Sequence, residues 1–174
     1  MENPQLPMRF LKDAWDELSE RDRARAELVA GWDLNFITAD QLVRLGLQPR
    51  DWDDEAKFEL KRFLTIKVLR DPHPLGCFGQ IVAAVWHAFI LDTQRYAEFC
   101  DKSYGKLIHH KPNNYGEGVA DNAIWISIYH EWFGLFPAVW KIDLVGMEVP
   151  GVEHAMNVEG QVSSANMDSD DGAY

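Results

Sequence analysis

The chain has 174 residues, of which 47% are hydrophobic and 12% aromatic, and its formal net charge is −11. This composition excludes a wholly disordered chain, because the apolar residues suffice for a core, and the length suits one domain. The acidic balance, without a basic patch interleaved with aromatics, argues against direct binding of nucleic acid.

The N-terminal half predicts a series of helices. Apolar residues at helical spacing predict a first helix that begins near residue 8 and includes Phe10, Leu11, Trp15 and Leu18. Ser19 can cap a continuation that ends at Gly31, and Thr38 can cap a short helix that ends before Gly46. Asp51 or Asp53 can cap a longer helix that runs to about residue 69, before the break at residues 71–74.

The second half predicts three further elements and a loop. Residues 80–91 are apolar on nearly every side, which predicts a central buried helix. Asp92 or Thr93 can cap the next helix, which turns Tyr96, Phe99 and Cys100 inward and stops at Gly105. A loop is predicted over residues 106–118. Asp121 can cap a last long helix, whose aromatic residues we expect to belong to the core.

These elements predict an all-α fold, a compact single-domain helical bundle over residues 1–148. The sequence predicts a disordered acidic tail over residues 149–174, because this segment is rich in Gly, Ser, Asn and Asp and shows no apolar periodicity. All 17 basic residues precede residue 142, so residues 148–174 contain no Lys or Arg. The same segment contains six acidic residues.

The sequence also favours a cytoplasmic location. Met1 does not lead into a basic and then apolar stretch of the kind found in secretory signals. The longest apolar run, residues 81–91, is far shorter than the roughly 20 residues of a membrane-spanning helix. Cys77 and Cys100 are too few for a disulfide framework. We therefore expect no membrane association.

One segment concentrates residues that can carry chemistry. Trp86 and His87 are followed by Leu91, Tyr96, Cys100, Gly105, His109 and His110. Over about 30 residues this pattern resembles the tryptophan-histidine segment of the glycine-rich domain-containing-protein-like family. The sequence departs from that pattern at Ala83, where an acidic residue is expected, and it has no glycine-rich region. Because the family is largely uncharacterised, the resemblance implies a shared helical site and no particular reaction.

The turns at Asp92 and Gly105 suggest how this site could form. If both turns reverse the chain, then His87, Cys100 and one of His109 and His110 converge, which would suit Zn or another transition metal. Asp92 and Tyr96 share a helix face with Cys100 and could add oxygen ligands or orient the others. The spacing contains none of the short ligand pairs of known zinc motifs, and a core histidine beside a buried thiol explains the pattern equally well.

Three functions are consistent with these residues. The first is a small binding or accessory protein, with a protein partner, whose polar pocket around His87, Cys100, His109 and His110 holds a metal. The second is an enzyme that uses the same pocket, for instance with Cys100 as nucleophile and His87 or His109 as base. The third is an acidic interaction or inhibitor protein without a metal.

Overall fold

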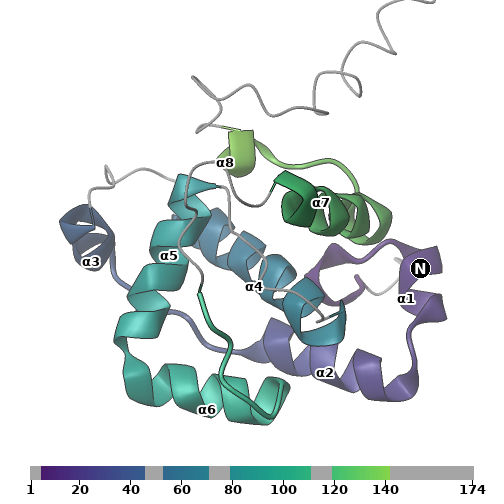
Figure 1. Ribbon diagram of the computed structural model, residues 1–174, viewed down its shortest axis with the longest axis horizontal. Coiled ribbons are helices and arrows are strands. Elements are labelled where there is room, and N and C mark those ends of the chain that lie inside the picture. The colour runs from purple at the N-terminus through teal and green to yellow at the C-terminus, as the bar shows by residue number, and fades with distance from the viewer. Residues whose placement is uncertain (1–4, 46–52, 71–78, 111–118, 142–174) are drawn as a thin grey trace, which may run out of the picture. The chain divides into compact units, whose positions relative to one another are not determined.

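The computed structural model describes residues 5–45, 53–70, 79–110 and 119–141, which belong to the first of two compact units, Met1–Asp143 (Figure 1). Within these ranges all regular structure is helical, so the all-α prediction is confirmed. In chain order the elements are the 3-10 helix η1 (Pro7–Arg9) and the α-helices α1 (Lys12–Glu17), α2 (Glu20–Gly31), α3 (Ala39–Arg44), α4 (Asp53–Arg70), α5 (Gln80–Leu91), α6 (Thr93–Ser103), α7 (Val119–Phe133) and α8 (Ala138–Lys141). The predicted acidic tail lies outside the described residues.

The predicted caps at Ser19 and Thr38 are confirmed, because the side-chain oxygen of each accepts a hydrogen bond from a backbone N–H group. Ser19 accepts a hydrogen bond from the backbone N–H of Asp22, and α2 begins directly after it. Thr38 and Gln41 form a reciprocal capping box at the start of α3. The predicted cap at Asp121 is wrong, because α7 already begins at Val119.

The N-terminal segment differs from the single helix expected there. Met8 and Arg9 have φ angles of 50° and 54°, in the left-handed region that non-glycine residues rarely adopt, so the chain cannot continue as one α-helix. Burial of Met8 and two hydrogen bonds hold this conformation. The Met8 carbonyl accepts from Arg62 Nε at 2.9 Å, and the Leu11 N–H donates to the Trp132 carbonyl at 2.8 Å.

Helix α4 is the element around which the described residues pack. It contacts α2, α5 and α7, while α5 also contacts α3, α6 and α8. The Phe63 ring of α4 contacts three tryptophan rings, those of Trp86, Trp125 and Trp140. Their centroids lie 5.2 to 6.4 Å from the Phe63 centroid. Large rings from four helices therefore fill one continuous core, and the predicted core role of the α7 aromatics is confirmed.

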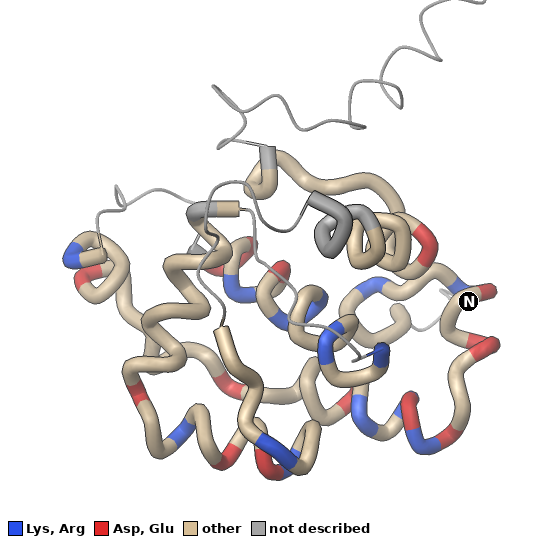
Figure 2. The backbone as a smooth tube through the Cα atoms, viewed as in Figure 1, with Lys and Arg blue, Asp and Glu red and all other residues tan. Residues whose placement is uncertain are grey.

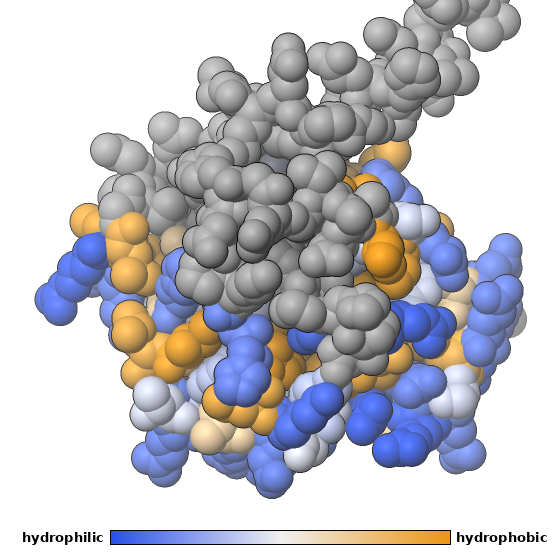
Figure 3. Space-filling view, viewed as in Figure 1, coloured by the Kyte–Doolittle hydropathy of each residue, from blue (hydrophilic) through white to orange (hydrophobic). Residues whose placement is uncertain are grey.

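Charge and apolar surface are distributed unevenly over the helices. Figure 2 shows both signs of charge along α1, α2 and α6, whereas α5 is uncharged along its length. Apolar side chains reach the surface over α3 and the adjoining part of α5 (Figure 3), and Val43, Leu45 and Leu91 are among the exposed large apolar residues. In the described part of the chain, every helix is too short or too polar to span a lipid bilayer.

Candidate functional site

A corner between α5 and α6 positions the residues predicted to form the site. Helix α5 ends at Leu91, and the Asp92 side chain caps α6 by accepting a hydrogen bond from the Arg95 backbone N–H at 3.2 Å. The predicted cap at Asp92 is therefore confirmed. Because α5 and α6 contact each other, the inward side of α6 lies against α5.

The segment after α6 returns along this helix pair. Gly105 has a φ angle of +84°, which favours glycine, and its N–H donates to the Cys100 carbonyl at 2.9 Å. The following residues run back beside α5 (Figure 1). The Ile108 N–H donates to Cys100 Sγ at 3.5 Å, and the Tyr96 hydroxyl donates to the Ile108 carbonyl at 2.6 Å. These bonds fix the path of the chain as it approaches His109 and His110.

His87 and His110 form a pair at the end of this path. Their ring centroids lie 4.5 Å apart with the planes at 63°, and the His110 ring also meets the Trp86 ring edge-on at 4.6 Å. His110 is half-buried, whereas His87 is exposed, so the predicted central buried helix reaches the surface at His87. Burial lowers the pKa of His110 below its ordinary value, and the neighbouring His87 lowers it further.

Cys100 lies in a separate, buried part of the same cluster. It is 1% exposed, and Tyr96 beside it accepts a hydrogen bond from the Trp86 indole N–H at 3.2 Å. Burial raises the pKa of the Cys100 thiol, and burial together with Cys100 raises the pKa of the Tyr96 hydroxyl. Both groups are therefore protonated at neutral pH. A thiol in this state is a poor nucleophile, so the geometry gives no support to Cys100 in that role.

The other predicted residues lie apart from the histidine pair. His109 is exposed and has no ring contact with His87, while both Asp92 oxygens are taken up by Arg95. Among the described residues, no group of three or more His, Cys, Asp or Glu side chains is arranged to hold a metal ion. Of the four residues predicted as ligands, the fold thus joins His87 and His110 by direct contact and links Cys100 to them through Trp86 and Tyr96.

A second polar cluster, which the sequence analysis missed, lies inside the core. Glu59 is 1% exposed and accepts hydrogen bonds from Tyr129 Oη at 2.5 Å and from Trp140 Nε1 at 2.7 Å. Arg62 pairs with the second Glu59 oxygen at 3.1 Å. The spacing of Glu59 and Arg62, three residues apart among apolar residues of one helix, was the available signal. With every oxygen partnered and no surface access, this cluster ties α4 to α7 and α8.

Comparison with known proteins finds one family model that is similar to part of the chain. A family model described as UCP032817-like matches residues 41–124, slightly less than half of the chain. No curated protein and no solved structure matches the chain. The resemblance to the glycine-rich domain-containing-protein-like family is therefore wrong. Three residues of its pattern, Trp86, Tyr96 and Cys100, are buried where α5 packs on α6, and this kind of packing does not distinguish one family from another.

Proposed function

We propose that the chain is a small binding protein whose His87 and His110 side chains coordinate a transition-metal ion. The observation that supports this most directly is the contact between the two rings, 4.5 Å apart, on the accessible side of α5. Neither imidazole forms a hydrogen bond to another described residue, so their nitrogens are available to a ligand.

The protonation state of His110 favours this role. A metal binds only the neutral imidazole, and protons compete with it at low pH. Because burial and His87 lower the pKa of His110 below 6.5, this ring is mainly neutral at pH 7. Metal binding should then be retained at pH 7 and lost as the pH falls through the lowered pKa of His110. Imidazole nitrogens suit Zn, Cu, Ni and Fe rather than Mg or Ca.

Two protein ligands leave coordination positions open. Structural zinc sites are usually closed by four protein ligands, whereas an open position admits water or a donor from another molecule. This favours a binding or accessory role in which a protein partner completes the site. Cys100 is a free, buried thiol, which is consistent with a cytoplasmic protein.

Zinc titration of the untagged chain by isothermal calorimetry tests the proposal. We expect one Zn²⁺ per chain, with the affinity lowered at least roughly tenfold in His87→Ala and in His110→Ala, since each variant removes one ligand. His130→Ala is the matched control, because His130 lies on α7 and its Nδ1 is 3.0 Å from the Gly134 carbonyl. Zinc affinity should be unchanged in that variant.

Two further variants separate the histidine pair from the larger ligand set. Cys100→Ala and His109→Ala should retain stoichiometric zinc if the pair alone binds. Loss of zinc from both variants would instead support the set of four residues. Equal zinc binding by the parent chain, His87→Ala and His110→Ala would refute the proposal and favour an interaction protein without a metal.

A further inference from the structure

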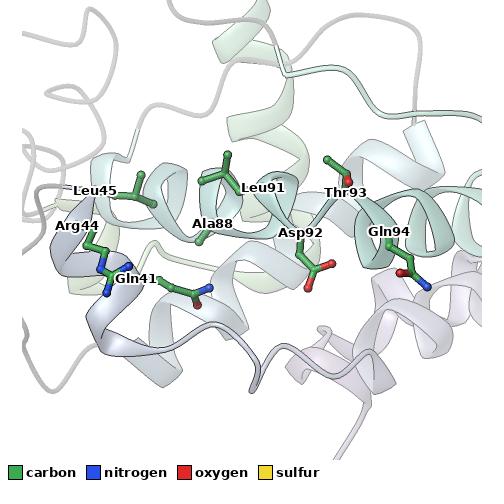
Figure 4. Close-up of a pocket in the computed structure, with 8 residues that line it drawn as sticks. All are labelled: Gln41, Arg44, Leu45, Ala88, Leu91, Asp92, Thr93 and Gln94. Atoms are coloured by element: carbon green, nitrogen blue, oxygen red, sulfur yellow. The ribbon is translucent and has the colours of Figure 1, made fainter.

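A pocket lies between α3 and the corner where α5 passes into α6. Its volume is about 510 Å³, within the range of roughly 300 to 1,000 Å³ that is usual for small-molecule sites. Helix α3 forms one wall, and the last turn of α5 with the first turn of α6 forms the other (Figure 4). Neither His87 nor His110 lines this pocket, so it is a separate candidate site.

One part of the pocket is apolar. Leu45 lines it from the end of α3, and Ala88 and Leu91 line it from the last turn of α5 (Figure 4). Leu91 is 71% exposed and Leu45 is 39% exposed, although leucine is a residue that folding normally buries. A ligand with an apolar portion would remove this surface from water, which contributes about 25 cal/mol for each Å² covered.

The other part of the pocket carries the positive charge of Arg44, which has no ionic partner among the described residues. Asp92 lines the pocket but is already neutralised, because Arg95 binds its two oxygens through the backbone N–H at 3.2 Å and Nη1 at 3.0 Å. Arg44 is exposed and forms no ion pair or hydrogen bond with any described residue. A guanidinium in this setting can bind a carboxylate through two parallel hydrogen bonds.

Gln41 adds a neutral donor beside Arg44. Its Oε1 accepts the Thr38 backbone N–H at 2.8 Å as part of the capping box, which fixes the orientation of the amide. The Gln41 amide nitrogen keeps its two donor hydrogens. The polar part of the pocket is therefore rich in donors, and its one acidic group is occupied.

From this combination we propose that the pocket binds a small monocarboxylate with an apolar chain. Arg44 and Gln41 hold the carboxylate, and Leu45, Leu91 and Ala88 cover the chain. This goes beyond the proposed metal site, because it concerns a different ligand and different residues. Its failure or success leaves the zinc experiment unaffected.

Sodium octanoate added to the ¹⁵N-labelled full chain tests the proposal by chemical-shift titration. We expect saturable shifts centred on the amides of Arg44, Leu91 and Thr93. Arg44→Gln should weaken binding roughly tenfold, since it removes a charged hydrogen-bond donor. Leu91→Ala should weaken binding roughly threefold or more, since it removes apolar contact. Octan-1-ol, which lacks the charge, should bind the parent chain as weakly as octanoate binds Arg44→Gln.

Matched variants outside the pocket serve as controls. Arg21→Gln changes an exposed arginine of α2, and Leu135→Ala changes a leucine that is 83% exposed beyond α7, so both should bind octanoate like the parent. Equal octanoate affinity in Arg44→Gln and the parent would overturn the proposal. So would an absence of saturable shifts, or shifts centred elsewhere. Concentration-dependent shifts of the same amides without octanoate would overturn it in favour of a second copy of the chain.

Discussion

Glu59 shows how a single residue of α4 joins elements that are distant in the sequence. Its carboxylate accepts from Tyr129 and Trp140, which lie 70 and 81 residues further along the chain, and pairs with Arg62. Burial raises the pKa of Glu59 above its ordinary value, although the hydrogen bonds of Tyr129 and Trp140 and the charge of Arg62 act in the opposite direction. Desolvation of the carboxylate thus outweighs its partners.

We expect Glu59→Ala to lower the free energy of unfolding by about 3 to 5 kcal/mol, because Arg62 would remain buried without its partner. Urea denaturation measures this. The control is Glu98→Ala, which breaks an exposed pair with Lys102 and should change the unfolding free energy by no more than about 0.5 kcal/mol. Similar losses in the two variants would contradict the structural role assigned to Glu59.

The raised pKa of Glu59 also fixes the sign of its pH dependence. Above the ordinary value of 4.5 the folded chain retains a proton that the unfolded chain releases, so this group makes the free energy of unfolding fall as the pH rises toward the folded pKa. A Glu59→Gln variant cannot titrate at this position, and its unfolding free energy should lack this contribution over the same pH interval.

At the scale of whole elements, the start of α5 is set by its contact with α8. Gly79 immediately precedes α5, and a Cβ atom at this position would lie 2.8 Å from Cε3 of Trp140. Trp140 is 1% exposed and packs against Phe63 and Trp125, so its ring has little room to move. The close approach of α5 and α8 therefore requires glycine here.

Gly79→Ala should accordingly lower the free energy of unfolding by about 1 to 3 kcal/mol through overpacking. Gly31→Ala is the matched control at the end of α2, where a Cβ atom would meet nothing within 4 Å. That change should raise the unfolding free energy by up to about 1 kcal/mol, because alanine is the better helix former. Thermal or urea unfolding of both variants checks the expected opposite signs.

At the scale of the whole molecule, the described helices share one core centred on α4. For residues 149–174, which lie outside the described part of the chain, the predictions come from the sequence alone. Residues 149–174 contain few apolar groups and carry only negative charge. Ordering such a segment costs chain entropy that little apolar burial can offset. The sequence thus predicts that folding of the helical part does not depend on these residues.

Truncation after residue 148 should leave the melting temperature within about 2 °C of the full chain. Limited proteolysis of the isolated full chain should remove this segment before it cuts the helices. A decrease of several degrees on truncation, or equal resistance of tail and helices to protease, would show that the tail is part of the folded unit.

The sequence alone determined the features that depend on near neighbours. The helical class, the caps at Ser19, Thr38 and Asp92 and the turn at Gly105 follow from side chains that act within about five residues of one another. Helical periodicity likewise identified most of the core, because the side of a helix that is apolar is the side that packs.

Only the tertiary structure decided which distant residues meet. Whether Cys100 or Trp86 lies beside His110 depends on the path after Gly105, which the buried bonds of Ile108 fix. The partners of Glu59 depend on how α7 and α8 pack on α4, and the left-handed turn at Met8 exists because Arg62 and Trp132 hold its surroundings. Such contacts join residues as far apart in the sequence as Leu11 and Trp132, and no local pattern encodes them.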